Sequence, residues 1–403
     1  MNSPSARLRE ELPKSHMDFS LVLGGPLFQL LRRAHLSDDA LQLARRRIVF
    51  IALFAWLPLL LLSAFDGQLF GGEAAVPFLK DFEAHVRFLV VLPLLIGAEL
   101  VVHQRMRFVV KQFLERKLIP EDAIAKFDAA IESAFRLRNS MLAEVLIIAL
   151  VYVVGIQVVW RQYMALDAAT WYATPSATGA SLSTAGMWLA YISLPVLQFL
   201  LCRWYFRLFV WARFLWQVSR IPLNLIPTHP DRLGGLGFLS ATAYAFIPLA
   251  MAHGAMLAGP LANRIFHLGA GLLDFKLEII ALLVVLVCVL FGPLLVFAPQ
   301  LAQAKRTGIR EYDTLAQRYV REFDAKWLRG GAPADESFVG SGDIQSLADM
   351  GNSLEVVRTM RLAPISKDAL IQLAVATLVP VAPLLLTMMS LEEIMKKLLG
   401  ILF

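Results

Sequence analysis

The segment RRRIVFIALFAWLPLLLLSAF, residues 45–65, decides the class of protein to which this chain belongs. Its last 18 residues carry no charge and would form a helix about 27 Å long, close to the roughly 30 Å thickness of a bilayer's hydrocarbon layer. Three consecutive arginines precede it, which is typical of a flank that stays in the cytoplasm. The segment therefore predicts a retained signal-anchor helix with the N-terminus in the cytoplasm.

Apolar blocks of similar length recur along the rest of the chain. With 58% hydrophobic and 17% charged residues, the composition is too apolar for a soluble protein, and the blocks lack the alternation of barrel strands. We predict an all-α, polytopic membrane bundle of about seven transmembrane helices with a small cytoplasmic helical collar. The predicted spans are 48–65, 84–102, 141–160, 187–205, 238–258, 277–297 and 369–389.

The distribution of Lys and Arg sets the predicted orientation. Alternate connecting segments hold 31 of the 38 basic residues, and such segments stay in the cytoplasm. The net charge of +6 follows from this topology, so we expect no nucleic-acid partner. The basic-rich segments are 1–47, 103–140, 203–237 and 298–368.

The chain divides into four predicted regions. Residues 1–47 form a cytoplasmic N-terminal segment with an interfacial helix, and residues 48–297 form a six-helix transmembrane region with a cytoplasmic hairpin at 103–140. Residues 298–368 are predicted to form two amphipathic cytoplasmic helices separated by a loop rich in Gly, Pro and acidic residues. The last region, 369–403, holds the final span and an amphipathic C-terminal helix that either lies on the outer surface or re-enters the membrane.

The loop THPDRLGGLGF, residues 228–238, is the most unusual local sequence. Glycines before a helix start can direct several backbone N–H groups at one anion. The alternative is a tight turn in which Asp231 caps the helix and the glycines permit close packing. For a ligand-binding function of this loop, the candidate residues are His229, Asp231, Arg232, Gly234 and Gly235.

Polar residues within the spans are the second group of candidates, because a charge in the membrane is costly and usually marks a pathway or a pair. Glu99 and Glu144 lie at similar depth near the cytoplasmic boundary, and Arg203 and Arg207 lie at that level one turn apart. They predict a charge cluster at the inner mouth of a pathway, or interfacial snorkelling with incidental ion pairs. His253, deeper in the fifth span, either relays protons or is a neutral histidine bonded to a carbonyl.

Three further features bear on function. Arginines alternate with aromatic residues over 203–220, which suits contact with anionic lipid headgroups or a simple interface anchor. Ala250, Gly254 and Ala258 form a small-residue face for close helix packing. Prolines occur in six predicted spans and favour transport weakly, because they bend helices. These prolines are Pro58, Pro93, Pro195, Pro248, Pro293, Pro380 and Pro383.

Motifs for hydrolase, protease, redox or dinucleotide chemistry are missing from the sequence. We therefore predict no catalytic residue, no cofactor and no metal site, and Cys202 and Cys288 act as small apolar residues. The expected partners are the lipid bilayer and anionic lipid headgroups, and a homo-oligomer is left open.

The sequences PTHPDRLGGLGF (227–238) and GDIQSLAD (342–349) resemble a group of uncharacterised bacterial polytopic membrane proteins. This resemblance covers most of the chain from the third span onward. It implies a bacterial inner membrane location, and it implies no activity and no site residues.

Two functions remain as hypotheses from the sequence. The kinked spans, inner charges and glycine loop favour a transporter or channel for an ion or small anionic solute. The paired cytoplasmic helices favour a scaffold or sensor that binds a partner protein or lipid headgroups. A lipid-modifying enzyme using His229 and Asp231 ranks third, because both residues are also expected in a turn.

Overall fold

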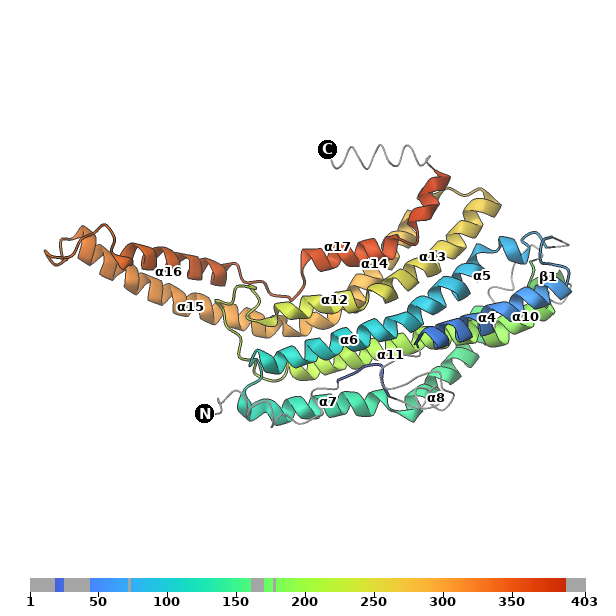
Figure 1. The fold of residues 1–403 in the computed structure, drawn as a ribbon, viewed down its shortest axis with the longest axis horizontal. Helices are drawn as coiled ribbons and strands as arrows, with labels where there is room; N and C mark the ends of the chain where they lie inside the picture. The colour runs from blue at the N-terminus through green and yellow to red at the C-terminus, as the bar shows by residue number, and fades with distance from the viewer. Residues whose placement is uncertain (1–18, 25–43, 72–73, 161–169, 177–178, 389–403) are drawn as a thin grey trace.

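A computed structural model of the chain describes residues 19–24, 44–71, 74–160, 170–176 and 179–388. The described chain is an elongated, almost entirely helical bundle with one helical hairpin projecting from one end (Figure 1). We call that end the arm end, and the opposite end, where a small β-hairpin lies, the hairpin end. Residues 1–18 and residues 389–403, where the amphipathic C-terminal helix is predicted, lie outside the described residues.

Four continuous helical stretches are long and apolar enough to cross a membrane, and two further pairs of helices, bent by 45° and 41°, would raise the number to six. The predicted all-helical membrane class therefore holds. The seventh predicted span corresponds to a shorter helix broken near its middle. The four stretches are Ala44–Phe65, Phe82–Glu115, Thr184–Val218 and Leu272–Leu328, and the bent pairs are Glu121–Arg138 with Met141–Gly155 and Leu236–Ala245 with Ile247–Leu268.

The individual elements subdivide these stretches. In chain order they are α4 (Ala44–Phe65), η1 (Phe78–Lys80), α5 (Phe82–Val86), η2 (Arg87–Val91), α6 (Leu92–Glu115), η3 (Glu121–Ala123), α7 (Ile124–Arg138), α8 (Met141–Leu150) and η4 (Val151–Trp160). After the β-hairpin come α10 (Thr184–Trp188), η5 (Leu189–Ser193), α11 (Leu194–Val218), η6 (Leu236–Ala241), α12 (Thr242–Ala245) and α13 (Ile247–Leu268). The last are η7 (Leu272–Phe275), α14 (Lys276–Phe291), η8 (Gly292–Phe297), α15 (Ala298–Phe323), η9 (Asp324–Leu328), α16 (Gly342–Arg358), α17 (Lys367–Leu378) and η10 (Ala382–Thr387).

Prolines coincide with most irregularities of these helices, because proline donates no backbone hydrogen bond and crowds the preceding turn. Pro93 and Pro195 directly follow the wide π turns η2 and η5. Pro248 follows the break between α12 and α13, Pro293 lies in the tight turn η8, and Pro380 lies in the break between α17 and η10. Among the described helices, the bend of 41° beside Pro248 confirms the prediction at that position. Pro58 lies inside the uninterrupted helix α4, and bends at the other prolines stay predictions.

Helix α13 packs closely against its neighbours through the small-residue face. Ala250 and Ala258 on this face are buried, and a Cβ added to Gly254 would collide with the carbonyl oxygen of Thr377 in α17. One turn further on, a Cβ at Gly259 would lie 3.0 Å from the backbone of α5. This face therefore brings α5 and α17 against α13, as small residues do in membrane bundles.

Residues 19–24 pack inside the arm end of the bundle. The ring of Phe19 is fully buried and lies 5.1 Å from that of Phe214 in α11, and Arg138 donates to the carbonyl of Ser20 at 2.6 Å. The sequence predicts an interfacial helix here, which is wrong for these six residues: they form bends and contact the core. The cause is that their apolar side chains find a protein surface rather than lipid headgroups. The remainder of that predicted helix lies outside the described residues.

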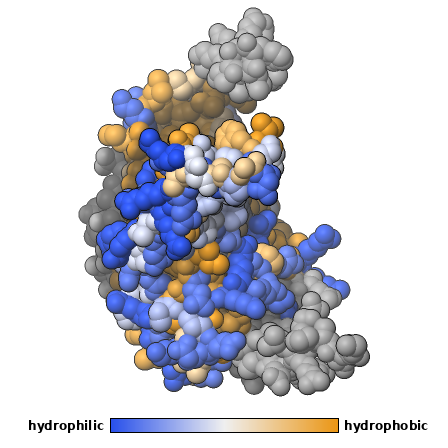
Figure 2. Space-filling model, turned by 90° about the vertical axis from the view of Figure 1, so that its left-hand side faces the viewer, coloured by the Kyte–Doolittle hydropathy of each residue, from blue (hydrophilic) through white to orange (hydrophobic). Residues whose placement is uncertain are grey.

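The projecting arm consists of α15 and α16, the two amphipathic helices that the sequence predicts in this region. They lie antiparallel and project from the bundle, so the predicted collar around the inner ends of the spans is not what they form (Figure 1). Asp343 fixes the tip, since its side chain accepts hydrogen bonds from Lys326 and Trp327, both at 2.8 Å. Its carbonyl also accepts from the Tyr319 hydroxyl at 3.1 Å. Viewed from the arm end, the molecule presents a mainly hydrophilic face (Figure 2).

The hairpin end contains β1 (Ala173–Ser176) and β2 (Gly179–Leu182), an antiparallel pair that the sequence analysis did not predict. Next to it, the buried carboxylate of Asp81 accepts hydrogen bonds from the indole N–H of Trp171 at 2.7 Å and from the amide of Asn263 at 2.8 Å. These bonds tie the hairpin region to α5 and α13.

Candidate functional site

Four helices bring charged side chains together within the arm-end half of the bundle. Glu99 of α6 accepts a hydrogen bond from Arg47 of α4, and a second one at 2.7 Å from Arg207 of α11. One turn earlier on α11, Arg203 lies 3.7 Å from Glu144 of α8. We call these five residues the arginine–glutamate cluster. The sequence predicted four of them at a common depth, and the structure brings those four together.

Local packing explains why the two arginines of α11 stay in place. They are one helical turn apart and therefore share a face. The guanidinium of Arg207 lies 4.8 Å from the ring centre of Trp204, and the indole N–H of Trp204 donates to the carbonyl of Leu95 at 2.9 Å. The aromatic ring thus fixes α11 against α6 and positions Arg207 beside Glu99, while Arg203, one turn earlier on the same face, reaches toward Glu144 of α8.

The cluster is buried and its charges do not cancel. The side chains of Arg47, Glu99 and Arg207 are only 4–6% exposed, and those of Arg203 and Glu144 are 9% and 13% exposed. Among the described residues, three guanidinium groups of the cluster face two carboxylates, and Arg138 lines the small void beside Glu144 and Arg203, so positive charge is in excess. An uncompensated charge in a dry site is unfavourable, and this excess distinguishes the cluster from a closed set of ion pairs.

Two guanidinium groups of the cluster also keep unused hydrogen-bond donors. Among the described residues, the buried Nε of Arg47 has no hydrogen-bond partner. Within the same part of the chain, the structure contains no hydrogen bond from the Arg203 guanidinium, since its distance to Glu144 exceeds the hydrogen-bond range. Buried donors without an acceptor are rare and indicate a missing partner or a functional role.

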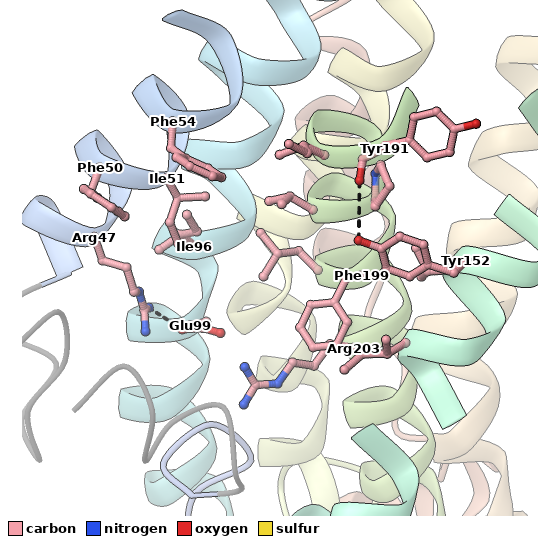
Figure 3. Close-up of a pocket in the computed structure, with 16 residues that line it drawn as sticks. Arg47, Phe50, Ile51, Phe54, Ile96, Glu99, Tyr152, Tyr191, Phe199 and Arg203 are labelled. Carbon is pink, nitrogen blue, oxygen red and sulfur yellow. Dashed lines mark hydrogen bonds and ion pairs between the residues drawn. The ribbon is translucent and has the colours of Figure 1, made fainter. Parts of the chain in front are cut away.

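A groove with a volume of about 500 Å³ opens directly above the cluster, between α4 and α6 on one wall and α8, η4, η5 and α11 on the other. In Figure 3, Arg47 and Arg203 approach the same end of this groove from opposite walls, with Glu99 between them. Apolar and aromatic side chains line the rest. Tyr152 donates to the carbonyl of Tyr191 at 3.4 Å and closes the far part of one wall.

The glycine loop has a different geometry. The carboxylate of Asp231 accepts three backbone N–H groups, from Leu233 at 2.7 Å, Gly237 at 2.8 Å and Gly235 at 3.2 Å. His229 Nδ1 lies 2.9 Å from the same carboxylate. Burial acts to raise the pKa of Asp231, but the three donors and His229 outweigh it and hold this pKa below its ordinary value. The donors that could have bound an anion are thus occupied by the chain itself.

The loop is also tied to its surroundings through its backbone. Arg361 donates its N–H to the carbonyl of Arg232 at 2.8 Å and its guanidinium to the carbonyl of Asp231 at 3.1 Å. Arg232, Gly234 and Gly235 all have positive φ values, of 56°, 62° and 100°, which glycine adopts without strain. This geometry favours the tight turn that caps the following helix over a ligand site.

His253 lies apart from both features, buried in α13. Its Nδ1 is 2.8 Å from the carbonyl of Leu249, and its Nε2 is 2.6 Å from the hydroxyl of Tyr205. A carbonyl only accepts, so Nδ1 carries the proton and Nε2 accepts from the tyrosine. This arrangement favours the neutral, carbonyl-bonded histidine over a proton relay.

Sequence reasoning missed two parts of the site. Arg47 was interpreted only as part of the basic flank of the first helix, although it completes the cluster. The groove was not predicted at all, because Tyr152, Tyr191 and the apolar wall residues resemble ordinary lipid-facing side chains. The position of Arg47 within the first turn of α4 is a signal that could have identified it, since a snorkelling arginine at that place can also turn inward.

No protein-family model matches the chain, and no similar curated protein or solved structure was found. Within the described residues, the structure contains no group of three or more His, Cys, Asp and Glu side chains that could hold a metal ion. Function must therefore be inferred from the groove and the arginine–glutamate cluster themselves.

Proposed function

We propose that this protein is a seven-span carrier of a bacterial inner membrane that binds an anionic solute at the arginine–glutamate cluster. In this proposal α17 and η10 together form the seventh span, because the 21 residues from Lys367 to Thr387 are about 30 Å long as a helix. The N-terminus and the arm lie in the cytoplasm, as the distribution of Lys and Arg favours.

The observation that supports this function is the excess positive charge of the buried cluster. Glu99 compensates for two neighbouring arginines at once, and the ion pair of Arg203 with Glu144 is long. An anion bound beside Arg203 would supply the missing charge and accept the free donors. Arginine suits this role because its planar group donates in a fixed geometry and stays ionised.

A carrier fits the structure better than an open pore. Large aromatic side chains, among them Phe88, Phe113 and Trp211, are fully buried between the helices, so a bound solute would move only after the helices rearrange. The π turns and breaks beside the prolines supply positions at which helices can bend without losing many hydrogen bonds. Alternating access of this kind is the usual behaviour of membrane carriers.

The test is anion binding and flux with purified protein in liposomes. We expect uptake of at least one anion from a panel of inorganic anions, carboxylates and phosphate esters, and a decrease of about 10- to 100-fold with Arg203→Gln, since a charged hydrogen bond contributes about 1.5–3 kcal/mol. Arg318→Gln, on the exposed face of α15, is the control. Absence of both binding and flux across the panel would overturn the proposal.

A second function, a scaffold or sensor, is favoured by the arm alone. Its outer surface exposes apolar side chains, among them Val320, Leu328 and Val339, and exposed apolar surface often marks a protein contact. Crosslinking and pull-down from native membranes would test it. Recovery of one partner with wild type and its loss with Val320→Glu would support this function, and an unchanged set of proteins with both chains would exclude it.

A further inference from the structure

The groove above the arginine–glutamate cluster is apolar along most of its length. Its walls include Phe50 and Phe54 of α4, Ile148 of α8, and Val196 and Phe199 of α11. Its volume of about 500 Å³ lies within the range of roughly 300–1,000 Å³ found for small-molecule sites. A small hydrated anion would gain nothing from such walls, whereas a hydrocarbon chain would be stabilised by them.

The charged groups of the groove are gathered at one end. Arg47, Glu99 and Arg203 lie together at the arm end of the groove, while its middle is formed by side chains such as Ile51 and Ile96 (Figure 3). An apolar slot that ends in guanidinium groups is complementary to a molecule with an apolar tail and an anionic head. In the proposed orientation this end faces the cytoplasmic leaflet.

Access to the cluster also differs between the two sides. Several groove residues are about half exposed on the flank of the bundle, for example Phe50 at 54% and Tyr191 at 51%. On the arm-end side, the described residues leave only a void of about 10 Å³ between Arg203 and the packed segment 19–24, which is room for about one water molecule. The wide path to Arg203 therefore runs sideways, from the hydrocarbon region.

The unused donors lie where a headgroup would sit. Arg47 is buried and its Nε lacks a partner within the described chain, and Arg203 keeps its donors free of hydrogen bonds to described residues. The excess positive charge of the cluster can be offset by the negative charge of a phosphodiester.

We propose that the groove binds one anionic glycerophospholipid of the cytoplasmic leaflet, with its phosphodiester at Arg203 and Arg47 and one acyl chain between α4 and α8. This inference rests on the proposed function and deepens it, because it names the anion as a membrane lipid that arrives laterally. Glu99 acts as a positioning residue, since it holds Arg47 and Arg207 in place.

The experiment measures lipid retention by native mass spectrometry. Full-length protein is reconstituted in nanodiscs of equal parts phosphatidylglycerol and phosphatidylcholine, released into mild detergent, and scored for the lipid that stays bound. We expect one bound phosphatidylglycerol, preferred about tenfold or more over phosphatidylcholine. Equal retention of the two lipids would overturn the inference.

Two pairs of variants locate the site. Arg203→Gln should abolish the preference for phosphatidylglycerol, whereas Arg213→Gln, whose guanidinium bonds to Ser133 on the surface of α7, should keep it. Val196→Trp should fill the groove and reduce retention of both lipids, whereas Val285→Trp on the exposed face of α14 should leave it unchanged. Thermal unfolding identifies variants that do not fold, and Arg203→Met, which also removes the charge, then replaces Arg203→Gln as the test of charge. An unchanged preference in a folded Arg203 variant would overturn the inference.

Water-soluble anions separate this inference from the proposed function. Glycerol 3-phosphate and inorganic phosphate are titrated against the same protein by calorimetry. Binding of either that depends on Arg203, together with no selective lipid retention, would overturn the lipid inference and leave the anion carrier in place. Lipid retention without binding of these soluble anions would support the inference, and binding of neither class would overturn both.

Discussion

The glycine loop and the arginine–glutamate cluster both contain charged side chains, but they differ in how many of their hydrogen-bond donors have an acceptor. In the loop, one carboxylate, that of Asp231, accepts three backbone donors, and the chain satisfies its own groups. In the cluster, Arg47 and Arg203 keep donors without acceptors among the described residues, and positive charge is in excess. The comparison teaches that the number of unpaired groups, rather than the presence of glycine, arginine or histidine, distinguishes a structural turn from a binding site.

The largest expected effect comes from removing the central carboxylate of the cluster. Glu99→Gln leaves two buried guanidinium groups without their shared counter-charge, and we expect a loss of about 3–5 kcal/mol in the free energy of unfolding. The measurement is reversible unfolding in mixed detergent micelles. Glu322→Gln, which breaks an exposed pair on the arm, should cost less than about 0.5 kcal/mol. Equal losses in the two variants would show that the buried ion pairs of the cluster stabilise the protein no more than an exposed ion pair does.

The next effect concerns the loop. Asp231→Ala removes the acceptor of three backbone N–H groups, and we expect a loss of about 2–3 kcal/mol, because some of these donors remain shielded from water. Unfolding under the same conditions measures it, with Asp335→Ala in the exposed arm loop as the control. If the loop were a ligand site rather than a turn, this variant would lose anion binding while its stability stayed unchanged.

The pH dependence of stability sharpens the assignment of Asp231. Its pKa is lower in the folded protein than its ordinary value, so the unfolded chain takes up the proton first. The stabilisation by this carboxylate is therefore complete above the unfolded pKa of about 3.9 and is lost as the pH falls through the folded pKa. Wild type should exceed Asp231→Asn in stability at pH 7, and the difference should narrow below about pH 4. A constant difference across this range would contradict the assignment.

The smallest effect on stability is expected at Arg203. Its guanidinium makes no hydrogen bond to a described residue, so Arg203→Gln should change the free energy of unfolding by less than about 1 kcal/mol. Anion binding should nevertheless fall, as proposed above. A large loss of stability with unchanged anion binding would show that the cluster, like the loop, stabilises the fold and does not bind an anion.

The sequence predicts much of this architecture because burial in lipid depends on simple properties. Run length predicts the apolar helices, and the period of apolar residues predicts the arm helices α15 and α16. The depth of a residue along a helix follows from counting residues, so the common level of Glu99 and Arg207 could be predicted. The number of candidate spans in the structure is lower than the seven predicted, because α17 and η10 are separated by a break that residue counting does not reveal.

Other features depend on partners that are distant in the sequence. Whether Arg47 turns toward Glu99 or toward lipid headgroups depends on how α4 and α6 rotate against each other, and the apolar pattern of α4 does not fix that rotation. The burial of segment 19–24 depends on a surface that α7 and α11 create together. The groove forms where the helices of its two walls do not contact each other. The sequence of one helix alone does not show such a gap.

The continuous helical stretch Leu272–Leu328 has a mechanical consequence. Its 57 residues extend for about 85 Å, almost three times the thickness of the hydrocarbon layer. In the proposed topology the part beyond Phe297 extends about 46 Å away from the membrane. A bend of about 10° at the tight turn η8, which contains Pro293, would therefore move the tip of the arm sideways by about 8 Å.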